Sequence, residues 1–257
     1  MKKYFLVIAR YKNEKQEIFD NHISPINQRY CDKHGFEYVA ICNDEPLQLI
    51  RDNPTWWKFT IVQEWINNGR LQEGDIVTHF DADMVIVKDD QPYQTNKSFS
   101  YAIDNGNTHC MGNYSITVNE WSVDLINRIL SEDLYQKLKD TDHWQNFREQ
   151  AAWYTLSGIL PHSWVSFFDM PNYGFHSTIS PELHYSLEDL EKHVEVRGPE
   201  WDTTLLAEEA DDAVSQALQK YNIVKSKKED TIVRHFAGGQ PWAEEYFKPP
   251  AKKVFQI

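Results

Sequence analysis

The stretch Ile76-Val77-Thr78-His79-Phe80-Asp81-Ala82-Asp83-Met84-Val85-Ile86-Val87 places two carboxylates, one residue apart, inside an apolar run rich in β-branched residues. Such a run is typical of a strand that is buried on both faces of a sheet. Two unpaired carboxylates in a protein core would be strongly destabilising. We therefore expect the strand to end near Phe80, and residues 81–83 to form the loop at its carboxyl end.

A loop at this position is where open α/β sheets bind their ligands. Asp81 and Asp83 suit a hard divalent cation, Mg²⁺ or Mn²⁺, whose coordination the phosphate oxygens of a ligand would complete. Asp-x-Asp also occurs by chance in acidic chains, where it marks a solvated turn. The apolar residues on both sides of the pair favour the metal site.

Composition limits the classes of protein to consider. A chain of 257 residues with 41% hydrophobic and 14% aromatic residues fits a folded α/β protein of one large domain or two small ones. The formal net charge of −13 argues against a nucleic-acid partner, because phosphate backbones are bound by clustered Lys and Arg. Cations and polar, uncharged ligands fit this charge better.

Cysteine usage and the first residues bear on location. Cys31, Cys42 and Cys110 are an odd number without a Cys-x-x-Cys pair, so neither a disulfide framework nor a zinc knuckle is indicated, and we expect a reducing, cytoplasmic location. The apolar part of residues 2–10 is too short for a membrane span and predicts the first strand. No later segment reaches membrane length, so no membrane span is expected.

Strand-like and helix-like patterns alternate through the first half of the chain. Residues 14–34 have helical spacing broken at Ser24-Pro25, which indicates two helices or a kink, and His34-Gly35 ends them. Residues 36–41 predict a second strand, and residues 56–65 a helix that closes at residues 67–69. This order predicts an α/β fold with a Rossmann-like, mostly parallel sheet and helices on both faces.

The second half of the chain is less regular. We expect a strand over residues 115–118, an amphipathic helix over 119–130 and another helix over 146–156. Residues 171–199 are rich in Tyr, His, Pro and Gly, and predict loops that bind an acceptor or merely cover the surface. Because we find no internal repeat or clean linker, residues 1–257 are expected to form a single domain.

These residues resemble a known class of enzyme. A buried strand that runs into Asp-x-Asp after two βα units resembles the nucleotide-sugar glycosyltransferases of the GT-A fold, in which the motif holds a metal against the donor diphosphate. Further segments resemble the galactosyl/xylosyltransferases of glycosyltransferase family 34. They are Tyr30-Cys31-Asp32-Lys33-His34-Gly35-Phe36, Asn119-Glu120-Trp121-Ser122-Val123-Asp124-Leu125, Glu149-Gln150-Ala151-Ala152, Arg234-His235-Phe236-Ala237-Gly238-Gly239 and, loosely, Trp57-Lys58.

The matches follow the family's order from Arg10 to Gly239, although Gly239 stands where the family has a second Cys. The resemblance implies a nucleotide-binding half over 1–105, a donor and acceptor half over 106–240, and a tail or lid over 241–257. It implies a hexosyl- or pentosyltransferase that uses a nucleotide sugar, UDP-sugar above all, and a saccharide or glycoconjugate acceptor. It also implies retention of the anomeric configuration.

Metal and donor roles follow for particular residues. Asp83 would bind the metal directly, while Asp81 could bind it or hold the ribose or a metal-bound water. His235 would be a further metal ligand; taken alone, a His after a strand is more often structural, and the resemblance reverses that preference. In the donor site we place Arg10 and Lys58 at the pyrophosphate, with surface ion pairs as their alternative role. The remaining candidate donor residues are Ala82 in the motif, Asn113 (with His109 and Cys110) at the sugar, Gly238 at the phosphates and Trp242 as a stacking face.

Glu149 and Gln150 are the catalytic candidates. A carboxylate or amide at these positions could stabilise an oxocarbenium-like centre on the far face of the donor sugar. The alternative is a solvated first helical turn, in which acidic residues interact favourably with the helix dipole. The two interpretations are about equally supported.

Two other functions compete with the transferase. Haloacid-dehalogenase-type phosphatases also carry a strand followed by Asp-x-Asp, but the motif normally follows their first strand, whereas here it comes after two βα units. A noncatalytic carbohydrate-binding protein could keep the transferase fold and its metal. Release of nucleoside diphosphate from a donor separates the transferase from the binding protein, because a binding protein would release none.

Overall fold

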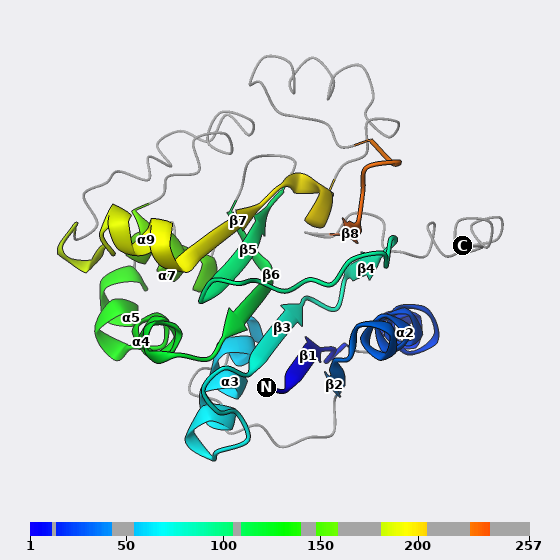
Figure 1. The fold of residues 1–257 in the computed structure, drawn as a ribbon, viewed down its shortest axis with the longest axis horizontal. Helices are drawn as coiled ribbons and strands as arrows, with labels where there is room; N and C mark the ends of the chain where they lie inside the picture. Colours follow the sequence, from blue (N-terminus) through cyan, green and yellow to red (C-terminus); the bar gives the residue numbers. More distant parts are fainter. Residues whose placement is uncertain are drawn as a thin grey trace.

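A computed structural model describes residues 1–11, 14–42, 54–104, 109–139, 148–158, 181–204 and 227–236. Its centre is a six-stranded sheet in the order β2-β1-β3-β6-β5-β7 (Figure 1). The neighbouring pairs β1–β2, β1–β3 and β5–β7 are parallel, and β6 runs antiparallel to both β3 and β5. The predicted mostly parallel sheet is confirmed. The strands are β1 (Lys3–Ile8), β2 (Glu37–Ile41), β3 (Ile76–Phe80), β5 (Phe99–Ile103), β6 (His109–Thr117) and β7 (Val194–Arg197).

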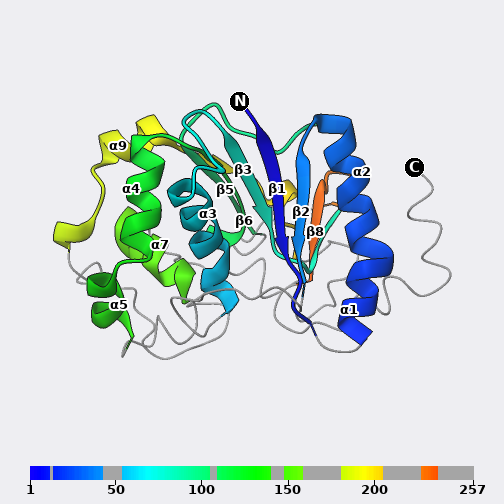
Figure 2. The same ribbon diagram turned by 90° about the horizontal axis from the view of Figure 1, so that it is seen from below.

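Helices cover both faces of this sheet, as predicted (Figure 2). One face packs against α3 (Trp57–Asn67), α4 (Glu120–Ile129) and α7 (Glu149–Ser157), with α5 (Glu132–Leu138) beside α7. The other face packs against α2 (Ser24–His34), which follows α1 (Glu14–Ile18). Each face has its own cluster of buried apolar side chains, so the sheet separates two cores.

The helical segment before β2 is broken where the sequence predicts. A π-helical turn, Phe19–Ile23, separates α1 from α2, and Pro25 lies in the first turn of α2, where its missing N–H is not needed. Gly35 ends α2 in the left-handed conformation with φ 72°, which a residue without a β-carbon adopts readily.

A second, two-stranded sheet positions the candidate site. β4 (Met84–Ile86) pairs antiparallel with β8 (Val233–His235), and the register sets Met84 opposite His235. The backbone N–H of Phe236 donates to the carbonyl of Asp83 at 3.1 Å. A segment about 150 positions later in the chain is therefore fixed against the Asp-x-Asp loop.

Some expected elements differ from the structure. The strand expected at residues 115–118 begins at His109. Residues 110–113 include Gly112 and Asn113, which are uncommon inside strands, yet all four residues are buried. The expectation that residues 171–199 lack regular structure is wrong for the described part, which contains α9 (Leu187–His193) and β7. β7 has four residues and was too short to recognise. The helix expected at 146–156 corresponds to α7, which begins at Glu149. Residues 146 and 147 of the expected range lie outside the described residues.

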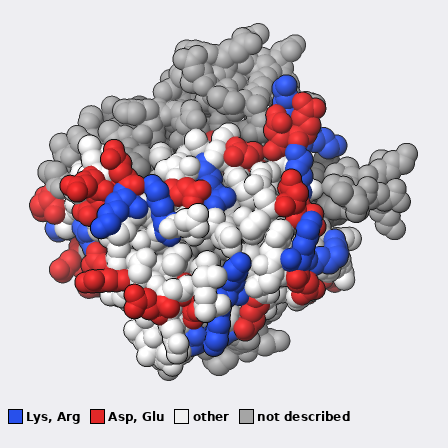
Figure 3. Space-filling view, in the orientation of Figure 1, with Lys and Arg blue, Asp and Glu red and all other residues white. Residues whose placement is uncertain are grey.

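Short 3₁₀ turns complete the described structure at Pro54–Trp56, Pro181–Leu183 and Pro199–Trp201. None of the helices in the described ranges is long and apolar enough to cross a membrane. On the face seen in Figure 3, acidic and basic side chains of the described residues alternate instead of forming one broad basic surface.

The start of α4 offers a test of the local structure. Asn119 accepts a hydrogen bond from the N–H of Ser122 at 3.0 Å, the Ser122 hydroxyl accepts from the N–H of Asn119 at 2.9 Å, and Asn119 also donates to Ser98 at 2.9 Å. We expect Asn119→Ala to lower the free energy of unfolding by about 0.5–2 kcal/mol, measured in urea. Ser186→Ala at the exposed cap of α9 is the control and should cost less. Equal losses would contradict the added contribution of the bond from Asn119 to Ser98.

Candidate active site

The Asp-x-Asp loop joins β3 to β4 at the carboxyl end of β3. The N–H of Asp81 donates to the carbonyl of Gly112 at 2.6 Å, and the N–H of Met84 donates to the carbonyl of Asp81 at 3.0 Å. These bonds form a tight turn that keeps both carboxylates at the sheet edge, while Ala82 between them is buried. The expected end of the strand at Phe80 is confirmed.

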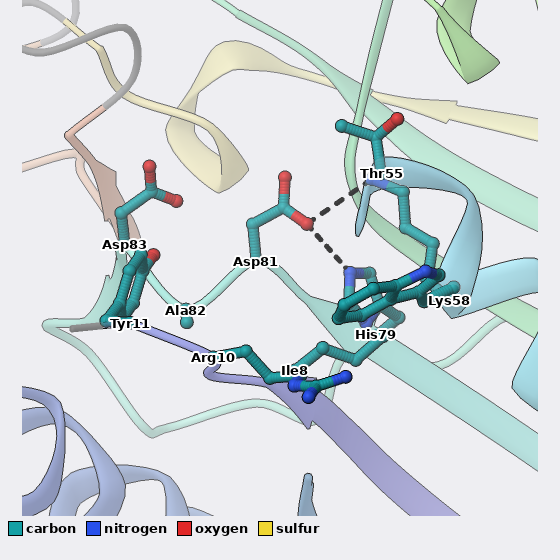
Figure 4. A pocket seen from close by; sticks show the side chains of 10 residues that line it. Ile8, Arg10, Tyr11, Thr55, Lys58, His79, Asp81, Ala82 and Asp83 are labelled. Atoms are coloured by element: carbon teal, nitrogen blue, oxygen red, sulfur yellow. Dashed lines mark hydrogen bonds and ion pairs between the residues drawn. The ribbon is translucent and has the colours of Figure 1, made fainter. Parts of the chain in front are cut away.

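Asp81 contacts two nitrogen donors with a single oxygen, Oδ1. His79 Nε2 lies 2.9 Å from it and Lys58 Nζ 3.3 Å from it (Figure 4). Burial opposes the ionised carboxylate, yet the Lys58 ammonium and the His79 hydrogen bond hold the pKa of Asp81 well below its usual range. Burial in turn lowers the pKa of His79. Asp81 is thus held as an anion.

Lys58 is buried although it is charged. Only 3% of its side chain is exposed, and Nζ lies 3.1 Å from Glu149 Oε1 as well as donating to the carbonyl of Met111 at 2.6 Å. Burial disfavours the ammonium, but Asp81 and Glu149 outweigh it and raise the pKa of Lys58. The partners of Lys58 are site carboxylates, and not the surface carboxylates of its alternative role.

His235 lies between two carboxylates. Its Nδ1 is 2.7 Å from Asp202 Oδ1, and its Nε2 is 3.6 Å from Asp83 Oδ1. Burial opposes the imidazolium, but Asp202, Asp83 and Asp81 together raise the pKa of His235 to about 9. For Asp83, burial and the charge of Asp81 outweigh His235 and raise the pKa.

Asp81, Asp83 and His235 could hold a metal ion. One ligand atom from each side chain lies within 4.8 Å of the others. Two carboxylates and an imidazole are a donor set that suits a divalent cation such as Mn²⁺. A second group with the same spacing, Cys110, Asp202 and His235, is buried and shares His235.

A cavity of about 270 Å³ opens beside the Asp-x-Asp loop (Figure 4). Its walls mix cationic, aromatic and acidic side chains. The Arg10 guanidinium lies 4.6 Å from the ring centre of Trp57, and burial followed by the charge of Asp83 raises the pKa of Tyr11. The lining residues are Ile8, Arg10, Tyr11, Thr55, Trp57, Lys58, His79, Asp81, Ala82 and Asp83.

The catalytic candidates lie at the start of α7, next to this group of charges. Glu149 is buried and paired with Lys58. Gln150 accepts from the N–H of Met111 at 3.0 Å and donates to the Tyr154 hydroxyl at 2.7 Å. The buried ion pair excludes a solvated first turn for Glu149. A catalytic role for either residue stays a prediction.

The proposed sugar-pocket residues lie within β6, and not in a loop before it. Asn113 is fully buried, and its amide bonds to Tyr93, Ala102, Trp201 and Asp202. His109 bonds to the Tyr101 hydroxyl at 2.5 Å. Asn113 and His235 therefore share Asp202 as a hydrogen-bond partner, and a sugar contact of Asn113 stays a prediction.

One of the remaining candidates lies within the described residues, and the others lie outside them. Trp201 is also an aromatic candidate for sugar stacking, but it is only 5% exposed and packs edge-on against Tyr93. Gly238, Trp242 and the predicted lid over 241–257 lie outside the described residues. Sequence reasoning missed His79, Tyr11 and Asp202. His79 stands two residues before Asp81, which was a usable signal, whereas nothing in the local sequence marks Asp202.

Comparisons with known proteins concern the fold. No protein-family model and no curated protein matches the chain. It is similar to a glycosyltransferase involved in glycosylation of the PBCV-1 major capsid, with 12% identity, coverage of 93% of this chain and 95% of that chain, and a TM-score of 0.49. It is also similar to galactosyltransferase LgtC in complex with donor and acceptor sugar analogues, with 10% identity, coverage of 99% of this chain and 94% of that chain, and a TM-score of 0.46. A third similar structure is glycosyltransferase GlyE of Streptococcus pneumoniae TIGR4, with 12% identity, coverage of 93% of this chain and 55% of that chain, and a TM-score of 0.44.

These three neighbours are glycosyltransferases, which is the class of enzyme that the sequence motifs resemble. The narrower resemblance to family 34 stays a prediction. At these identities and TM-scores, the likeness does not transfer an activity to this chain.

The buried ion pair gives a stability test. Lys58→Met should lower the free energy of unfolding by about 3–5 kcal/mol, because it leaves the buried Glu149 carboxylate without a cation. Adding Glu149→Gln to Lys58→Met should recover part of that loss. Urea unfolding measures both, and a double variant no more stable than the single one would contradict the pairing.

Proposed function

We propose that this protein is a metal-dependent glycosyltransferase that moves a sugar from a nucleotide sugar, UDP-sugar above all, to a saccharide or glycoconjugate acceptor. The observation that carries the proposal is the convergence of Asp81, Asp83 and His235 beside the cavity at the carboxyl end of β3. This edge of a parallel sheet is where α/β folds bind nucleotides. Retention of configuration is part of the proposal and rests on the resemblance in sequence.

The metal would be Mn²⁺ or Mg²⁺. It would be held by Asp81, Asp83 and His235, and when bound it would neutralise the charge that develops on a nucleoside diphosphate leaving group. Among the described residues, Lys58 and His79 both contact Oδ1 of Asp81, so a cation would be bound by Oδ2. By keeping Asp81 ionised, these two residues maintain a ligand that is ready for a cation.

The cavity offers complementary contacts to a nucleotide. Arg10 supplies positive charge beside the ring of Trp57. Trp57 and Tyr11 both line the cavity, and a base or sugar ring can pack on such aromatic side chains. Lys58 lies deeper and balances Asp81 and Glu149. A diphosphate would therefore meet Arg10 at the cavity wall, while Lys58 organises the carboxylates beneath it.

The first test is a screen of nucleotide sugars with and without Mn²⁺, with nucleoside diphosphate release as the readout. We expect release that needs the metal and falls at least about 100-fold in Asp83→Asn. Asp90→Asn changes an exposed carboxylate and should retain activity. Metal-dependent donor binding without any release would favour a carbohydrate-binding protein. Hydrolysis of simple phosphomonoesters without sugar transfer would favour the phosphatase.

A second test uses pH. The pKa of His235 is about 9 without metal, so at pH 7 the imidazole is charged and must lose a proton to become a ligand. Mn²⁺ affinity should therefore rise by about tenfold per pH unit between pH 7 and 9 and level off above that range. Loss of the free Mn²⁺ electron paramagnetic resonance signal measures the affinity. His235→Ala should flatten the profile, and an equally steep profile in that variant would contradict the assignment.

A further inference from the structure

Asp202 is a buried carboxylate surrounded by hydrogen-bond donors. It is 0% exposed and follows the short 3₁₀ turn Pro199–Trp201. Oδ1 lies 2.7 Å from His235 Nδ1, and Oδ2 accepts from Asn113 Nδ2 at 3.1 Å. Cys110 also bonds to Asp202, and burial raises the pKa of this thiol, so it remains an S–H donor. All three of these neighbours can donate to a carboxylate oxygen, so Asp202 serves as their common acceptor.

The orientation of Asn113 is set by the backbone. Its Oδ1 accepts from the N–H of Ala102 at 3.1 Å, and a peptide N–H can only donate. The Tyr93 hydroxyl donates to the same oxygen at 2.6 Å. The NH₂ of Asn113 must therefore face Asp202. Flipping the amide would set two donors against each other.

We infer that Asp202 is a positioning residue that fixes the tautomer of His235, through a relay that begins at the N–H of Ala102. Since Asp202 only accepts, Nδ1 of His235 keeps its proton when the ring is neutral. The lone pair then resides on Nε2, the nitrogen that faces Asp83. The inference rests on the proposed metal centre, and it adds the residue that makes His235 a competent ligand.

Asp202→Asn is the informative change. An amide has one acceptor oxygen, but His235 and Asn113 both donate toward this position. Because Asn113 is held by Ala102, the group that can adjust is His235, by accepting at Nδ1 and carrying its proton on Nε2. The proton on Nε2 then prevents this nitrogen from binding a metal. Because Asn has nearly the same size as Asp, the packing at position 202 is retained.

The first experiment measures the protonation of the two His235 ring nitrogens in the wild-type protein, and a variant serves only to assign the signals. Long-range ¹H–¹⁵N spectra of the wild-type protein report both ring nitrogens of His235, identified by comparison with His235→Gln. On adding Zn²⁺, we expect the Nε2 resonance to shift while Nδ1 stays protonated. Zinc bound through Nδ1 would overturn the inference and favour the group of Cys110, Asp202 and His235. An imidazole that does not respond to Zn²⁺ would instead contradict the metal centre itself.

The second experiment compares two ions. Imidazole is a preferred ligand of Ni²⁺, whereas Mg²⁺ prefers oxygen ligands. Asp202→Asn should weaken Ni²⁺ binding by about 10–100-fold, measured by calorimetry, and weaken Mg²⁺ binding much less. A general distortion of the site would weaken both ions alike and would overturn the inference.

Two control variants change neighbours of Asn113 and Asp202 but leave the hydrogen bonds from Ala102 through Asn113 and Asp202 to His235 in place. Tyr93→Phe removes one donor to Asn113 but leaves the Ala102 N–H in place, so the affinity ratio of Ni²⁺ to Mg²⁺ should stay within about twofold of wild type. Cys110→Ser should also leave that ratio unchanged. A loss of Ni²⁺ affinity in Cys110→Ser as large as in Asp202→Asn would mean that the thiol is a ligand, and would overturn the inference.

Discussion

The need to balance carboxylates at the end of a buried strand organises this structure. Asp81 and Asp83 cannot remain in an apolar sheet without compensation. The fold supplies it from two distant places in the chain, Lys58 of α3 and His235 of β8, and from His79 of β3 itself. Each of these side chains is buried because a carboxylate neighbours it, and their packing in turn fixes the loop. In this group of contacts the carboxylates of Asp81, Asp83, Glu149 and Asp202 outnumber the cationic side chains of Lys58 and His235, which favours a bound divalent cation.

Much of this arrangement follows from local sequence pattern. The β-branched run up to Phe80 and the break at Ser24-Pro25 are short-range signals, and both are present in the structure. The carboxyl end of β3 could be predicted as a ligand edge because parallel strands end together. His235 needed the resemblance to a family, since a single His after a strand carries little information by itself.

The rest could not be predicted because it depends on pairing between distant residues. Asp202 meets His235 through the isolated bridge between Thr203 and Arg234 and the sheet formed by β4 and β8. Neither contact leaves a periodic trace in the sequence. Residues 109–114 looked like a loop for a related reason, since a strand that buries Asn113 is stable only when every polar atom of that side chain finds a distant partner.

Gly112 shows how the same strand serves both the sheet and the site. A β-carbon at this position would lie 3.0 Å from Asp81 Oδ2 and 3.1 Å from Cys110 Sγ. The absence of a side chain therefore lets the Asp81 carboxylate lie directly over β6, while the Gly112 carbonyl accepts the N–H of Asp81. Glycine weakens a strand interior, and it is tolerated where another group must approach the backbone closely. The positions of β6 that break the apolar strand pattern are thus those that shape the site around Asp81 and His235.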